Sequence, residues 1–142
     1  MRHLLFRVAL CIALAVVGAS FVTTANAQTA AFQANVPFSF QAAGRDMPAG
    51  MYTVAVERAY RRVDLRSAEG RTTFLASNPS GSVISGKSTL VFHRVGDRYF
   101  LREVMSHNAE FGHRLPISRA ERILTNVAGL RPVVETVVAG SR

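Results

Sequence analysis

The residues that most readily suggest chemistry lie at 81–88, where the sequence GSVISGKS matches the pattern G-x-x-x-x-G-K-[ST] at Gly81, Gly86, Lys87 and Ser88. In nucleotide-binding proteins the backbone N–H groups of this loop surround the phosphates, the lysine contacts the outer phosphates and the hydroxyl binds Mg²⁺. That mechanism requires a helix whose N-terminus points at the anion. Here a β-forming run, TLVFH, follows the loop. We therefore interpret the match as a false positive and expect no nucleotide or other cofactor.

Two histidines and an acid form a second candidate set, because His107, Glu110 and His113 lie close together in the chain. Imidazole and carboxylate groups can bind zinc, which makes these residues weak candidates for metal ligands. Their spacing matches no defined metal signature and H-E-x-x-H is absent, so we expect no metal site. The same stretch, 106–114, is where a small hydrolase would assemble its active site. No G-x-S-x-G elbow occurs, so no catalytic residue is assigned and a non-enzymatic role is favoured.

The first 27 residues have the three parts of a secretory signal peptide. Arg2, His3 and Arg7 form a positive start, residues 8–22 form an apolar run, and an A-x-A cleavage pattern ends at Ala27. The run is shorter than the ~20 apolar residues that a membrane-spanning helix needs. We therefore expect cleavage after Ala27 and export to the periplasm or beyond the cell.

Cleavage changes the composition of the chain. Removing 27 of the 142 residues leaves 115, and the net charge falls from +8 to +6 because Arg2 and Arg7 are lost. The only cysteine, Cys11, is lost as well, which excludes a disulfide scaffold and any cysteine-based zinc site. A length near 115 residues is sufficient for one domain with a single hydrophobic core.

Alternation of apolar and polar residues predicts a mainly antiparallel β domain. Pro37 lies inside the first alternating segment and indicates an edge strand, because proline cannot donate to a ladder. Between two later segments, Ala68-Glu69-Gly70 is typical of a three-residue hairpin loop with Gly70 in the left-handed region. The polar stretch 78–88 is expected to be a loop. The alternating segments lie at 36–40, 52–56, 63–65 and 72–76.

The clearest hairpin joins residues 89–95 to 98–105 through Gly96-Asp97. Glycine at the first central position fits a two-residue type II′ turn. This register would place Val91 opposite Arg102, and Val104 on the same face as His93. Both faces are partly apolar, so we expect the hairpin to lie centrally and to be covered on both sides.

After Pro116 the pattern changes to that of a helix near 118–128. Ser118 and Glu121 form a capping box, and Gly129 is placed to end the helix. Residues 133–138 form either a last strand or a frayed tail. The expected organisation is therefore a signal peptide at 1–27, a flexible leader at 28–33, one β-rich domain at 34–128 and a last strand or tail at 129–142. The predicted apolar stripe of the helix consists of Ala120, Ile123, Leu124 and Val127.

Four segments together resemble a family of small exported bacterial proteins without an established activity. They are VPFSF at 36–40, MPAGMYTV at 47–54, LVFHRVGDRYFL at 90–101 and LPISRAE at 115–121. Family members often carry an acidic residue in place of Ser39 and an aromatic residue near Met105. The resemblance implies an exported all-β protein and provides no catalytic residue for transfer.

The fold class expected from these patterns is all-β, a small barrel or sandwich of about six to eight strands with one short C-terminal helix. We expect a non-enzymatic envelope or secreted module that binds a small apolar ligand or an envelope component, or that is itself a structural component of the envelope. A ligand binder of this kind predicts an enclosed apolar cavity. The arginines are spread along strands next to acids, so weak attraction to anionic surfaces is expected and specific nucleic-acid binding is not.

Overall fold

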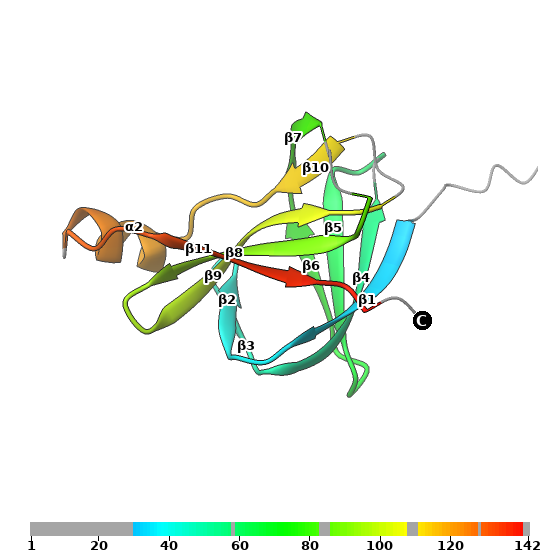
Figure 1. Cartoon of the computed structure of the whole chain (residues 1–142), viewed down its shortest axis with the longest axis horizontal. Helices are drawn as coiled ribbons and strands as arrows, with labels where there is room; N and C mark the ends of the chain where they lie inside the picture. The colour runs from blue at the N-terminus through cyan, green and yellow to red at the C-terminus, as the bar shows by residue number, and fades with distance from the viewer. Residues whose placement is uncertain (1–29, 58, 83–85, 108–110, 128, 141–142) are drawn as a thin grey trace, which may run out of the picture.

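The predicted all-β class is confirmed by a computed structural model, which describes residues 30–57, 59–82, 86–107, 111–127 and 129–140 (Figure 1). These residues contain eleven strands, more than the six to eight expected, and one C-terminal helix. The strands form two sheets that curve around a common core. No helix among the described residues is long and apolar enough to cross a lipid bilayer.

The first sheet has four antiparallel strands in the order β1-β4-β5-β6. Its β5–β6 connection is the predicted three-residue loop, in which Gly70 has φ +83° and its N–H donates to the carbonyl of Ser67 at 2.9 Å. The strands are β1 (Ala30–Val36), β4 (Gly50–Glu57), β5 (Arg62–Ser67) and β6 (Thr72–Ala76).

The second sheet runs β11-β8-β9-β10-β7, and the short β2 joins it by pairing in parallel with β9 and antiparallel with β3. The segment 133–138, for which strand and tail were both open, is a strand that pairs with β8. The remaining elements are β2 (Phe40–Ala42), β3 (Arg45–Met47), β7 (Asn78–Ser82), β8 (Thr89–Val95), β9 (Arg98–Met105), β10 (Phe111–Arg114), α2 (Arg119–Asn126) and β11 (Val133–Val138).

Three predicted boundaries differ from the structure. β1 begins at Ala30, within the segment expected to be a flexible leader, and it ends at Val36. The predicted strand 36–40 is therefore divided, because Pro37 lacks an N–H and the chain resumes ladder pairing only at Phe40. β7 lies in the polar stretch that was expected to be a loop, and it is held by antiparallel pairing with β10.

The central hairpin is confirmed, but its register differs from the predicted one on the side of Phe92 that is farther from the turn. Val91 pairs with Glu103 and not with Arg102, because a β-bulge interrupts the ladder between Val91 and Phe92. The bulge inserts one extra residue, which reverses the inward and outward alternation after it. Val104, predicted on the His93 face, consequently lies in the core opposite Leu90, while Glu103 is kept out of the core.

The space between the sheets is filled by side chains. Phe92 packs edge-on against both Phe38 and Phe40, with ring centroids 5.2 Å apart in each case. Phe40 also contacts Tyr52, whose hydroxyl donates to the Pro48 carbonyl at 2.6 Å. Aliphatic side chains from both sheets complete this cluster. The buried side chains that would line an enclosed apolar cavity between the described strands instead contact one another in this cluster.

Candidate binding cleft

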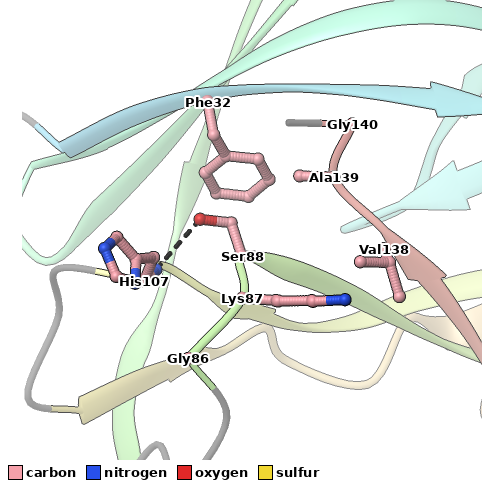
Figure 2. Close-up of a pocket in the computed structure, with 8 residues that line it drawn as sticks. All are labelled: Phe32, Gly86, Lys87, Ser88, His107, Val138, Ala139 and Gly140. Atoms are coloured by element: carbon pink, nitrogen blue, oxygen red, sulfur yellow. Dashed lines mark hydrogen bonds between the residues drawn. The ribbon is translucent and has the colours of Figure 1, made fainter. Parts of the chain in front are cut away.

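β1 and β11 are the outer strands of the two sheets, and they lie side by side without a hydrogen-bonded ladder between their described residues. A cleft of about 360 Å³ opens at this seam, which is within the ~300–1,000 Å³ range of small-molecule sites. Figure 2 shows the eight residues that line it. They are Phe32 from β1, Gly86, Lys87 and Ser88 before β8, His107 after β9, and Val138, Ala139 and Gly140 at the end of β11.

The cleft has an apolar side and a polar side. The half-buried Phe32 ring faces the end of β11 across the seam, where Val138 is half exposed (Figure 2). Across the cleft from Phe32, the exposed Lys87 side chain extends towards Val138 (Figure 2). Lys87 forms no ion pair with any described residue. The arrangement therefore offers an unpaired ammonium group next to an apolar wall.

Backbone contacts hold the polar side in place. The Ala139 N–H donates to the Ser88 carbonyl at 2.9 Å, which ties the end of β11 to the residues before β8. The Ser88 hydroxyl accepts a hydrogen bond of 2.9 Å from the His107 N–H. Ser88 thus connects three segments that are distant in sequence, and its neighbour Lys87 is positioned by this connection.

The structure distributes the residues of the phosphate-loop pattern differently from a nucleotide site. Gly86, Lys87 and Ser88 line the cleft, while Gly81 lies in β7. Residues 83–85 are outside the described residues. The strand β8 begins at Thr89, so the position where a phosphate-binding helix would start is occupied by a sheet strand.

The candidate metal and hydrolase residues do not share one environment. His107 is exposed and lines the cleft, whereas His113 is buried on β10, with its Nδ1 3.1 Å from the Ser77 hydroxyl. Glu110 lies outside the described residues. Within the described part of the chain, no group of three or more His, Cys, Asp and Glu side chains is placed to hold a metal ion.

The Ser77–His113 contact has the distance of a nucleophile–base pair. Only 4% of Ser77 and 5% of His113 are exposed, however. Neither residue lines the seam cleft or two further clefts, one between β2 and the β8–β9 turn and one beside Tyr52. Because both side chains are buried, the geometry favours a structural contact between β10 and the β6–β7 junction.

A second polar cluster lies beneath α2, where the Glu121 carboxylate, predicted to reach back to Ser118 in a capping box, contacts His93 and Arg102. Glu121 is only 3% exposed, and its Oε1 accepts from the His93 Nδ1 at 3.2 Å and lies 3.7 Å from the Arg102 Nε. Arg102 also donates to the Leu115 carbonyl at 2.7 Å. These contacts connect the helix to the outer face of the β8–β9 hairpin. The cluster lines none of the three clefts. We therefore assign it a structural role, in which it holds α2 against the β8–β9 hairpin.

The residues that sequence reasoning missed are those that close the cleft from the other side. Phe32 and the segment 138–140 carry no motif, and they meet only because β1 and β11 end the two sheets at the same seam. Comparison of the chain with known protein families, curated proteins and solved structures gave no match.

Proposed function

We propose that the protein is an exported, non-enzymatic binding module and that the seam cleft is its ligand site. The observation that carries this proposal is the unpaired Lys87 ammonium next to the apolar wall of Phe32 and Val138. Few polar groups combined with apolar lining residues are typical of small-molecule sites. The ligand accordingly has an anionic group that contacts Lys87 and an apolar part that lies against Phe32.

The size and position of the cleft support a small amphiphilic ligand. About 360 Å³ is available between two strands whose edges are not joined to each other. The core side chains pack against one another, and the seam cleft offers Phe32 and Val138 to an apolar group. The Ser88 hydroxyl also lines the cleft, where it accepts the hydrogen bond from the His107 N–H (Figure 2).

Decanoate is a suitable probe because it combines a carboxylate with an apolar chain. We expect saturable binding of decanoate to residues 28–142, measured by titration calorimetry, and much weaker binding of decanol. Lys87→Met should weaken decanoate binding about 10- to 100-fold, because hydrogen bonds to charged groups contribute about 1.5–3 kcal/mol. Arg66→Met is the matched control, since Arg66 is an exposed cation on β5 away from the cleft.

Two results would contradict the assignment of the cleft. One is decanoate binding that is equal in the wild type and Lys87→Met, because the carboxylate would then bind elsewhere. The other is tight binding of Mg-ATP that depends on Lys87, because the phosphate-loop pattern would then be functional.

The proposed export rests on the signal-peptide pattern, and the structure is compatible with it. Cleavage after Ala27 removes no described strand, because β1 begins at Ala30. When the full chain is expressed in a bacterial host, we expect the exported form to begin at Gln28 by intact mass. Ala27→Arg should block this processing, since the cleavage site needs small residues. An exported form that retains residues 1–27 would refute the cleavage.

The alternative, a hydrolase assembled from 106–114, has less support. Its best geometric element is the Ser77–His113 contact, which is buried and outside the clefts. Ester hydrolysis by the wild type that is abolished by Ser77→Ala and His113→Gln, with the fold retained, would favour the hydrolase over the binding module.

A further inference from the structure

The helix α2 is oriented with its acid inward, whereas Ile123 and the capping Val127 point outward. Glu121 is 3% exposed, while Ile123 is 48% and Val127 is 80% exposed. The exposed positions, which include Arg119 and Arg122, follow the i, i+3, i+4 spacing of a single helix face. This face therefore carries basic side chains near its start and apolar side chains towards its end.

The exposed apolar surface continues along the chain into β11. Leu130 is 39% exposed and approaches the hairpin turn at Gly96. Val134 is 62% exposed, and its ladder partner is His93. The His93 side chain contacts Glu121 of the helix. Because paired residues point to the same face of a sheet, Val134 lies on the face against which α2 packs. We call this set the α2–β11 surface: Arg119, Arg122, Ile123, Val127, Leu130, Arg131 and Val134.

The exposed charges of the α2–β11 surface all have the same sign. Arg119, Arg122 and Arg131 are exposed and form no ion pair with any described residue. The only acid of α2, Glu121, is buried against His93 and Arg102. Arginines on the strands differ, because several have acidic partners, such as Arg62 with Asp64 at 2.7 Å, Arg94 with Glu135 at 3.1 Å and Arg114 with Glu103 at 4.0 Å.

Exposed apolar side chains flanked by unpaired arginines are complementary to a lipid surface with anionic headgroups. The apolar side chains can enter the headgroup and acyl boundary while the guanidinium groups contact phosphates. Figure 1 shows α2 projecting at one end of the molecule, beside the turn of the β8–β9 hairpin. We propose that the α2–β11 surface docks onto an anionic lipid membrane.

Docking at this end would leave the seam cleft free. β11 begins near α2 and ends at the cleft, so the two sites are separated by the length of one strand, about 20 Å for six residues at ~3.3 Å each. The inference does not depend on the cleft ligand. It relies on the proposed export in one respect only, because export determines which membrane the protein meets.

Vesicle co-sedimentation tests the proposal. Because residues 28–142 contain every described element, this fragment is used after circular dichroism has confirmed its β fold. We expect it to bind vesicles of phosphatidylcholine and phosphatidylglycerol, with binding weakened by salt, and to bind pure phosphatidylcholine vesicles far less. Arg119→Gln/Arg122→Gln should reduce partitioning about 30-fold, because each arginine near an anionic surface contributes about 1 kcal/mol.

The apolar contribution is tested separately. Ile123→Gln/Val127→Gln should reduce partitioning by about 100-fold in total, or about tenfold for each side chain withdrawn from lipid. The matched controls are Tyr60→Gln/Phe74→Gln and Arg45→Gln/Arg66→Gln, which change exposed apolar and basic residues outside the α2–β11 surface. Both controls should bind as the wild type does.

Three results would overturn the proposal. No binding to anionic vesicles would exclude lipid as the partner. If the basic control loses as much vesicle binding as Arg119→Gln/Arg122→Gln, the protein is attracted to the vesicles by its net charge and not by this surface. Self-association in sedimentation velocity that Ile123→Gln/Val127→Gln abolishes, without vesicle binding, would assign the surface to a second copy of the chain.

Discussion

The buried carboxylate of Glu121 provides the sharpest test of how the C-terminal helix is held. Glu121 is almost fully buried, and the Arg102 side chain that faces it is only 11% exposed. Glu121→Leu would leave the Arg102 charge in a site nearly inaccessible to water. Removing one partner of a buried ion pair typically costs about 3–5 kcal/mol. A domain of this size has a total stability of about 5–15 kcal/mol, so the loss should be readily measured.

Two further variants separate the contributions to the free-energy cost of Glu121→Leu. Glu121→Gln keeps the shape of the side chain and an acceptor for His93, so it should cost less than Glu121→Leu, about 1.5–3 kcal/mol. Glu121→Leu/Arg102→Met removes both charges. It should be more stable than the sum of the single changes predicts, with a coupling of at least about 2 kcal/mol. Part of the coupling is offset because the Leu115 carbonyl loses the donor that it now has at 2.7 Å.

Urea unfolding of residues 28–142, followed by circular dichroism, measures these free energies. Amide hydrogen exchange in α2 is needed as well, because the helix can detach locally while the sheets remain folded. Single changes whose effects add within about 0.5 kcal/mol would refute the reasoning, since independent sites behave in that way. A cost of less than about 1 kcal/mol for Glu121→Leu in both measurements would refute it equally.

Three further predictions concern the cap, a tyrosine and the hairpin turn. Ser118→Ala should reduce stability by about 1 kcal/mol in urea unfolding, because the Ser118 hydroxyl accepts from the Glu121 N–H at 3.1 Å at the helix N-terminus, whereas Ser118→Asp should retain it. Burial, and secondarily the Glu69 carboxylate, raises the pKa of Tyr52 above its ordinary value of 10.0, against the effect of Arg71. The folded state therefore holds this proton more tightly than the unfolded state. Its contribution to stability should be complete below pH 10 and be lost as the pH rises further, and a Tyr52→Phe variant with the same pH dependence would contradict this. Gly96→Ala should cost about 1–2 kcal/mol, because Gly96 has φ +62° and an added Cβ would lie 3.5 Å from Leu130, whereas Gly86→Ala, where an added Cβ has open space, should cost less.

The short-range features of the fold were predictable because they depend on neighbouring residues. The positive φ of Gly70 and Gly96 follows from loops that only glycine adopts without strain. The Ser118 cap follows from the preference of serine for a free helix N–H. These signals fixed the loop between β5 and β6, the central hairpin and the start of the helix.

Features that depend on distant pairing were not predictable. The polar stretch around β7 becomes a strand only because β10 lies beside it. β2 pairs in parallel with β9, across more than fifty residues of chain. The seam cleft has the same origin. Lys87, Ser88 and His107 attracted attention as motif residues, but Phe32 and the end of β11 join them only through the closure of the two sheets.

The orientation of α2 shows why helical periodicity did not predict burial. The spacing of Ile123 and Val127 correctly indicated a helix and one of its faces, but periodicity does not determine which face meets the sheet. The bulge in β9 introduces one extra residue, Arg102, on the outer face of the hairpin. Arg102 lies against Glu121 of α2, while Ile123 and Val127 are exposed. We therefore expect the local pairing in β9 to influence which surface the helix exposes.

This causal order predicts that Glu121 controls vesicle binding without touching lipid. In Glu121→Ala/Arg102→Ala the inward positions carry only small side chains, so hydrophobic burial favours rotating the apolar stripe of α2 towards the sheet, because burying a side chain such as Ile123 is worth about 1.5–3 kcal/mol. Binding to anionic vesicles should then weaken although every residue of the α2–β11 surface is intact. Proteolysis and circular dichroism serve to confirm that the variant is folded. Unchanged partitioning of a folded variant would mean that the outward position of Ile123 and Val127 is set by the chain on either side of α2 and not by the buried ion pair.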